Sequence, residues 1–287
     1  MDMKINWFPG HMVKTRREIS ENLKLVDAVI EIRDARIVMS STNPEIKKIL
    51  GTKPRIILLN KADMAEDQVT KRWKSALEDE STLVLEVNSL TGKGLNGIKP
   101  ALLTLLKDKL ERNRERGLVN YTMRAMVVGI PNVGKSSFIN RMAKNAIAKV
   151  GDRPGVTKNK QWIKTKEGVE LLDTPGILWP KFEEETSLHL AFTGAIKDEI
   201  MDIETLALKL IEKLSIHYGH RLMERYGLEE LSDSSLENME TIAKKRGCII
   251  KGGEIDYQRV AVMLLDEFRS AKLGKISLEW PEVHHDA

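Results

Sequence analysis

One eight-residue segment limits the possible folds of this chain more than any other feature. It reads Gly129-Ile130-Pro131-Asn132-Val133-Gly134-Lys135-Ser136 and fits the pattern GxxxxGK[ST]. The glycines let the backbone curl so that successive amide N–H groups face a phosphate, and the pattern works between a strand and a helix. An apolar run, Met126–Val128, precedes it and a helical stretch follows. The sequence therefore predicts a phosphate-binding loop within an α/β fold.

Short apolar runs alternate with helical patterns through the first part of the chain. Alternating strands and helices favour a mainly parallel sheet with helices on both faces. Such sheets bind ligands beyond the carboxyl ends of their strands, so the functional residues are expected directly after each run. The predicted strands are 28–32, 55–59, 82–87, 125–128 and 169–172, and the predicted helices include 44–50, 66–77 and 95–116.

The pattern becomes helical after about residue 183. Apolar residues recur at helical spacing over 199–214, and 236–245 and 255–272 are also helical in character. A strand is suggested only at 276–278. We therefore predict two domains: an α/β domain over 1–183 and an all-helical domain over 184–287.

A second motif indicates which base is bound. Asn60, Lys61 and Asp63 form the sequence NKxD after the strand that ends at Leu59. The Asp63 carboxylate can accept hydrogen bonds from the ring N–H and the exocyclic amine of guanine, and adenine presents no such pair. The aliphatic stem of Lys61 can lie along the base plane. Asn88-Ser89-Leu90 follows another strand; it is either a plain turn or a segment that presents backbone amides and a hydroxyl to the base oxygen.

The remaining predicted contacts concern the phosphates and magnesium. Lys135 is expected to reach the β- and γ-phosphates and the Ser136 hydroxyl to bind Mg²⁺. Asp173, in the sequence Asp-Thr-Pro-Gly after a strand, is expected to hold Mg²⁺ through a water, and the Gly176 amide to sense the γ-phosphate. Thr157 is the candidate for a second magnesium ligand. The other residues of the phosphate-binding loop expected to bind nucleotide are Asn132, Val133, Gly134 and Ser137.

The order of these motifs is unusual, because the NKxD segment and Ser89 precede the phosphate-binding loop, Thr157 and Asp173–Gly176. The five motifs are those of translation-factor-class GTPases, and their order resembles that of the circularly permuted GTPases. Further signatures resemble the ribosome biogenesis GTPase A family. They are Trp7–Met12 at the start, and Gly252–Asp256 and Phe268–Lys275, which are similar to the helical C-terminal domain of that family.

The resemblance implies a protein that binds GTP and GDP, hydrolyses GTP to GDP and phosphate, and assists late assembly of the large ribosomal subunit. It also implies ribosomal RNA as a partner, Mg²⁺ as a cofactor, and K⁺ bound through Asn132; the alternative is that Asn132 only shapes the turn of the loop. The segment 116–166 carries eleven Lys or Arg against one acid, and Lys244–Arg246 is a further cluster. Both suit phosphate-backbone contacts, although solvated faces would carry the same charge.

The residue that commonly orients the attacking water for hydrolysis is missing from its usual position. Many GTPases place Gln directly after the DxxG motif, and this chain has Ile177 there. The resembled family has been credited with a substitute histidine, which maps to His11; the alternative is that His11 belongs to a structural or ribosome-contacting turn. A non-catalytic, nucleotide-controlled RNA-binding scaffold therefore stays open as the competing function.

The composition excludes several other classes. A single cysteine, Cys248, rules out an intrachain disulfide and any multi-cysteine zinc site. No run approaches the roughly 20 apolar residues needed to span a bilayer, and the opening residues lack a signal-type apolar stretch. We expect a cytoplasmic monomer without a membrane partner.

Overall fold

The computed structural model describes residues 17–118, 120–143, 162–174, 176, 182–196 and 202–282. The chain divides into two compact units. Unit 2 is Phe182–Leu278, and unit 1 combines the residues before it with the residues that follow Leu278. Within the described ranges, no helix is both long and apolar enough to cross a membrane.

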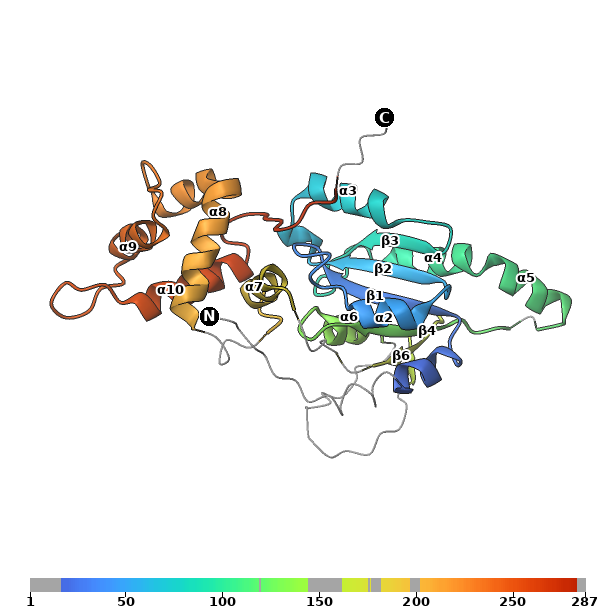
Figure 1. Cartoon of the computed structure of the whole chain (residues 1–287). Coiled ribbons are helices and arrows are strands. Elements are labelled where there is room, and N and C mark those ends of the chain that lie inside the picture. The colour runs from blue at the N-terminus through green and yellow to red at the C-terminus, as the bar shows by residue number, and fades with distance from the viewer. Residues whose placement is uncertain are drawn as a thin grey trace, which may run out of the picture. The chain divides into compact units, whose positions relative to one another are not determined.

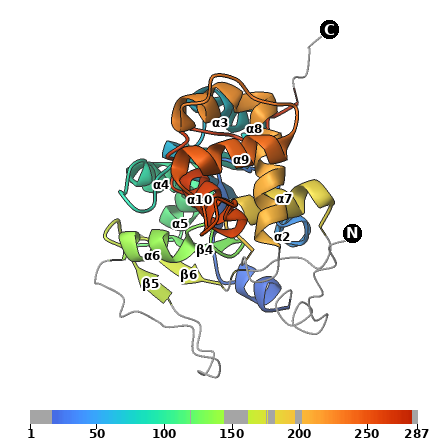
Figure 2. The ribbon, with the colours of Figure 1, turned by 90° about the vertical axis from the view of Figure 1, so that its left-hand side faces the viewer.

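Unit 1 is built on a six-stranded sheet in the order β3-β2-β1-β4-β6-β5. Figure 1 shows β3, β2, β1, β4 and β6, and Figure 2 shows β5 beside β6. Neighbouring strands are parallel, except that β5 runs antiparallel to β6 at one edge. The mainly parallel sheet was predicted, but β5 was not, since three residues are too few for a periodic pattern. The strands are β1 (Ala28–Asp34), β2 (Arg55–Asn60), β3 (Thr82–Glu86), β4 (Arg124–Gly129), β5 (Trp162–Lys164) and β6 (Glu170–Asp173).

Helices cover both faces of this sheet. One face packs against the helical residues 17–23, α2 (Pro44–Leu50) and α3 (Asp67–Leu77) through two apolar clusters. Val128 on β4 belongs to one cluster and Ile57 on β2 to the other, and both are paired in register with Glu31 on β1. Residues paired in this way point to the same face of the sheet, so the two clusters share this face. The other face meets α4 (Ile98–Leu105) and α6 (Lys135–Met142).

The central strand β1 is buried along its whole length, yet it carries charged residues. Glu31 accepts hydrogen bonds from Arg33 Nε at 2.8 Å and from Arg55 Nη1 at 3.2 Å. A buried carboxylate is tolerated only when it is paired in this way. The prediction of 28–32 followed the apolar residues, but β1 continues for two more residues. At this end of the strand, ion pairs take the place of apolar contacts.

The predicted helix 95–116 is three shorter elements. They are the 3₁₀ helix η2 (Leu95–Gly97), α4, and α5 (Lys107–Glu115). Leu106 separates α4 from α5 with a non-helical backbone and is itself buried. Helix α4 buries Ile98 and Leu102, whereas α5 buries none of its residues. Helix α4 therefore packs against the protein interior, whereas α5 does not. The prediction of one continuous helix did not distinguish the two.

Unit 2 is all-helical over its described residues, and α8, α9 and α10 pack against one another (Figure 2). The side chains of Asp202, Ser234 and Asp256 cap the first turns of α8, α9 and α10. Left-handed glycines, Gly227 and Gly247, end α8 and α9. The helices are α7 (Glu184–Phe192), α8 (Ile203–Tyr226), α9 (Ser235–Arg246) and α10 (Tyr257–Arg269).

Two predictions for unit 2 were wrong, one of a helix boundary and one of a strand. Helix α8 begins at Ile203, where Asp202 caps it, and continues twelve residues beyond the predicted end at 214, through a non-helical residue at Tyr218. Residues 276–278 are not a strand. Their apolar residues are buried, and the segment is held by the Tyr218 hydroxyl, which accepts a hydrogen bond from the Ser277 amide at 3.0 Å and donates one to the Ser277 carbonyl at 2.8 Å.

Residues 279–282 belong to unit 1 and not to the helical domain predicted from the sequence. The Glu279 carboxylate accepts hydrogen bonds from the Met39 amide at 2.6 Å and the Ser40 amide at 3.0 Å. Trp73 Nε1 donates to the Glu279 carbonyl at 3.1 Å, and Trp280 packs against the cluster that contains Trp73. The chain thus leaves unit 1 and returns to it.

Candidate nucleotide-binding site

The predicted site residues follow strands that meet at the centre of the sheet. From β1 the chain passes to β2 and β3 on one side, and it later returns to β4 and β6 on the other side. Ligands of parallel sheets bind at such a switch point, outside the carboxyl ends of the strands. Those ends here are Asp34 of β1, Asn60 of β2, Gly129 of β4 and Asp173 of β6.

The phosphate-binding loop lies between β4 and α6, in the predicted context. Gly134 has a left-handed φ of 105°, and a Cβ atom there would lie 2.2 Å from Asn60 Nδ2, so only glycine fits. Helix α6 begins at Lys135, and in the described part of the chain no side chain caps its first turn, which contains Ser136 and Ser137. The amides of such a turn and the helix dipole favour a bound anion.

Lys135 and Asp173 influence each other within this loop region. Lys135 Nζ donates to the carbonyls of Gly129 and Ile130, each at 3.3 Å. Burial lowers the pKa of Lys135 to about 8, and the Asp173 carboxylate opposes this shift. Burial likewise raises the pKa of Asp173 against the influence of Lys135. Both charges are therefore destabilised by partial burial, and a ligand that brings phosphate and a cation would stabilise them.

The segment after β6 approaches the same loop. The Thr174 hydroxyl donates to the Val127 carbonyl at 2.6 Å, which anchors the segment to β4. A Cβ atom on Gly176 would lie 2.7 Å from Lys135 Nζ and 3.0 Å from the Pro131 nitrogen. The Gly176 backbone therefore lies beside the phosphate-binding loop, where a residue that senses phosphate has to be.

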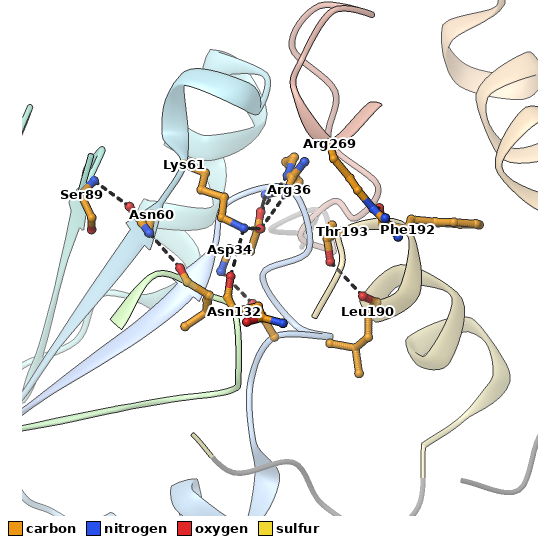
Figure 3. Close-up of polar contacts among 12 residues, drawn as sticks. Asp34, Arg36, Asn60, Lys61, Ser89, Asn132, Leu190, Phe192, Thr193 and Arg269 are labelled. Atoms are coloured by element: carbon orange, nitrogen blue, oxygen red, sulfur yellow. Dashed lines mark hydrogen bonds and ion pairs between the residues drawn. The ribbon is translucent and has the colours of Figure 1, made fainter. Parts of the chain in front are cut away.

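Asn60 connects three loops of the site. Its Nδ2 donates to the Val133 carbonyl at 2.8 Å, and its Oδ1 accepts a hydrogen bond from the Ser89 amide at 2.9 Å (Figure 3). The side chain is buried, so both interactions are made away from water. Asn60 thus links the NKxD segment to the phosphate-binding loop and to the segment after β3.

Lys61 and Asp63 extend the base side of the site. Lys61 has a left-handed backbone, and its Nζ donates to the Asn132 carbonyl at 3.3 Å. Asp63 lies in the 3₁₀ helix η1 (Ala62–Met64) and is exposed. Asn132, itself left-handed and exposed, therefore meets the NKxD segment through its backbone.

The segment Asn88–Leu90 makes internal contacts that the sequence did not indicate. Asn88 Oδ1 accepts hydrogen bonds from the Leu90 and Thr91 amides, both at 2.9 Å, while the Ser89 amide donates to Asn60. Those amides are thus already paired, and the Leu90 side chain is largely exposed. The Ser89 hydroxyl is buried without a hydrogen-bond partner in the described residues, so it is the group left for a ligand.

Sequence reasoning missed Asp34 and Arg36. Asp34 lies 2.9 Å from Lys61 Nζ and receives two hydrogen bonds from the Arg36 guanidinium (Figure 3). Burial alone would raise the pKa of Asp34, but the charges of Arg36 and Lys61 outweigh burial and hold it below its usual range. The available signal was an aspartate two residues after a predicted parallel strand.

Some predicted residues fall outside the described residues, namely His11, Thr157 and Ile177. In the part of the chain that is described, no three or more His, Cys, Asp or Glu side chains form a metal cluster. The Ser136 hydroxyl and the Asp173 carboxylate carry oxygen atoms, which are the ligand type that Mg²⁺ prefers.

Known GTPases are similar to this chain in sequence. A family model described as "50S ribosome-binding GTPase" matches residues 124–244. Ribosome biogenesis GTPase A of Bacillus licheniformis is 52% identical over 281 residues, covering 98% of this chain and 99% of the relative. Mitochondrial ribosome-associated GTPase 1 of Mus musculus is 33% identical, covering 95% of this chain and 89% of the relative.

Solved structures are similar over nearly the whole chain. The GNP-bound YlqF from Thermotoga maritima has a TM-score of 0.62 at 30% identity, covering 94% of this chain and 99% of that one. A GDP-bound YlqF structure has the same TM-score at 28% identity, covering 92% and 99%. With the motifs, their permuted order and this similarity taken together, the chain belongs to the ribosome biogenesis GTPase A family.

Proposed function

We propose that this protein binds GTP and GDP, hydrolyses GTP to GDP and phosphate, and assists late assembly of the large ribosomal subunit. The observation that carries the proposal is the convergence of Lys135, the uncapped first turn of α6 and the NKxD segment through Asn60. A phosphate-binding loop in contact with a guanine-recognition segment suits one ligand, a guanine nucleotide. Family membership supports the same function.

In this site Asp63 would pair with guanine, the Lys61 stem would lie along the base, and Ser89 would face the base oxygen. Lys135, Ser137 and the amides from Asn132 to Gly134 would hold the phosphates. Mg²⁺ would be bound by Ser136 and, through water, by Asp173, with Thr157 as a further ligand. Bound Mg²⁺ neutralises phosphate charge, which lowers the barrier to phosphoryl transfer.

Two finer features of hydrolysis belong to the proposal. The Asn132 side chain would hold K⁺ against the phosphates, and His11 would orient the attacking water in place of the missing glutamine. The Asn132 backbone is compatible with the first role, since its left-handed conformation and exposure leave the side chain at the surface of the phosphate-binding loop.

The helical unit would bind ribosomal RNA of the large subunit in the cytoplasm. Lys244, Lys245 and Arg246 occupy the last turn of α9 and are exposed, which suits contacts with phosphates. Lys and Arg at a helix C-terminus also complement the helix dipole, so this cluster serves local stability as well.

The test is release of phosphate from GTP in potassium buffer, with and without purified large ribosomal subunits, repeated in sodium buffer. We expect the subunits to stimulate hydrolysis and sodium to reduce it; Asn132→Ala should lose the preference for potassium while retaining GDP binding. Tight GTP binding without hydrolysis under any condition would favour the nucleotide-controlled RNA-binding scaffold instead.

A further inference from the structure

The ammonium group of Lys61 is held by two protein atoms. Nζ lies 2.9 Å from Asp34 Oδ2 and 3.3 Å from the Asn132 carbonyl oxygen. At the other end of the side chain, the backbone of Lys61 is fixed in the left-handed region at the start of η1. A lysine side chain ordinarily keeps much rotamer freedom at a protein surface. Both ends of the Lys61 side chain are therefore held in place without a bound nucleotide.

Asp34 is in turn held rigidly. Arg36 Nε donates to Oδ1 at 3.0 Å and Arg36 Nη2 donates to Oδ2 at 2.8 Å, a two-point contact with defined geometry. The Arg36 amide donates to Oδ1 as well, at 3.0 Å. Both residues are 2% exposed, and Asp34 ends the central strand of the sheet. The Asp34 carboxylate is therefore a fixed point at the edge of the site.

We propose that Asp34 is a positioning residue for guanine-nucleotide binding. Oriented by Arg36, its carboxylate keeps the Lys61 ammonium group beside the phosphate-binding loop, so that the Lys61 stem forms a preformed wall for the base. Asp34 acts through Lys61 and does not itself touch the nucleotide. Because the stem is already ordered, binding the base costs less conformational entropy. The inference rests on the nucleotide-binding function proposed above.

The alternative role for this ion pair is purely structural, as a means of neutralising buried charge at the end of β1. The two roles predict different couplings. A structural role lowers the stability of the protein whether or not residue 61 is lysine. A positioning role makes the effect of changing Asp34 on nucleotide dissociation depend on Lys61. A double-mutant cycle measures this dependence directly.

The experiment follows dissociation of a fluorescent GDP from the full-length protein by stopped flow. The variants are Asp34→Asn, Lys61→Met and the double variant; Met keeps the apolar stem of Lys61 and removes its charge. We expect each single variant to release GDP roughly tenfold faster and the double variant to release it no faster than the faster single one. Independent effects that multiply to roughly a hundredfold, or an unchanged rate in Asp34→Asn, would overturn the proposal.

Steady-state kinetics separates the positioning role of Asp34 from a structural one. In steady-state hydrolysis of GTP, Asp34→Asn should raise KM and leave kcat unchanged, because the base contact is common to the ground state and the transition state. Lys135→Ala serves as the control for binding itself and should abolish it. Absence of saturable GDP binding in the unaltered protein would refute the proposed function and this inference together, whereas a GDP-binding protein insensitive to Asp34→Asn would refute the inference alone.

Asp34→Asn removes a buried charge and is checked for folding by circular dichroism. A measurement on the unaltered protein keeps the proposal testable if that variant does not fold. Nuclear magnetic resonance of the ¹⁵N-labelled lysine ammonium groups, with Lys61 assigned by its loss in Lys61→Met, reports the motion of Lys61. We expect restricted motion in the nucleotide-free protein, in contrast to the exposed Lys93. Lys61 motion as free as that of Lys93 would overturn the proposal.

Discussion

The carboxylate of Glu279 accepts a hydrogen bond from the backbone amide of Met39 at 2.6 Å, although the two residues are 240 positions apart. The same carboxylate accepts hydrogen bonds from the amide and the hydroxyl of Ser40. These contacts fix the loop between β1 and α2 to the segment that follows Leu278. Because unit 2 is inserted between the two stretches of chain that form unit 1, the contacts hold the second stretch against the first.

Removing this attachment should destabilise unit 1. In Glu279→Ala, two backbone amides lose a charged acceptor, and we expect the free energy of unfolding to fall by about 1–3 kcal/mol. Urea denaturation followed by tryptophan fluorescence measures the loss, since Trp73 and Trp280 lie in the same region. The control is Glu282→Ala, which changes an exposed residue three positions further along. Equal stability of the two variants would contradict the prediction.

The phosphate-binding loop should not tolerate a side chain at Gly134. A Cβ atom there would lie 2.2 Å from Asn60 Nδ2, so Gly134→Ala should displace Asn60 and weaken GDP binding by at least roughly tenfold. Gly168→Ala is the matched control, because Gly168 also has a positive φ, of 79°, but has open space around its Cβ position. Both substitutions strain the backbone, but only Gly134→Ala also creates a steric clash. GDP titration of the two variants therefore isolates the effect of the clash on GDP affinity. Similar weakening in the two would argue against the role of Asn60.

Asp63 should determine the choice of base. In Asp63→Asn the pair of acceptors for the guanine N–H groups is lost, so GTP affinity should fall by roughly 10- to 100-fold, and affinity for xanthosine triphosphate should rise. Competition binding with both nucleotides measures the change. Asp108→Asn, an exposed substitution on α5, is expected to leave selectivity unchanged. Undiminished preference for GTP in Asp63→Asn would remove this residue from the base site.

GDP affinity should fall as the pH rises above about 8. Burial lowers the pKa of Lys135 to about 8 in the free protein, and nucleotide phosphates would raise it again. The complex then holds more protons than the free protein between these two pKa values, so binding takes up a proton there and weakens with increasing pH. Calorimetry in buffers of different ionisation enthalpy detects this uptake.

The control for that measurement is Lys135→Arg, whose guanidinium stays charged throughout this pH range. We expect it to show no proton uptake on binding GDP. Proton uptake of the same size in both proteins would assign the pH dependence to another group.

Much of unit 1 was predictable because its inner strands β1, β2 and β4 are largely buried on both faces and have the sequence of apolar runs between turn signals. The five predicted strands are present within one or two residues at each end, and the segment 129–136 lies where a strand-loop-helix pattern required it. The edge strand β5 and the interruption at Leu106 were missed, since each depends on packing against other elements. In unit 2, α9 is close to its predicted bounds because Ser234 and Gly247 cap its two ends. Helix α8 is longer than predicted because its last turns are buried within the unit.

The chemistry of the ligand followed from the sequence alone, since the residue types and spacings of the two nucleotide motifs admit few other functions. How those motifs meet depended on the tertiary structure. Asn60 bridges to Val133 and Ser89, Asp34 fixes Lys61, and Glu279 returns to Met39. The difference arises because local patterns report the burial and backbone preferences of neighbouring residues. Hydrogen bonds and ion pairs between distant segments depend on sheet order and register, which no local pattern encodes.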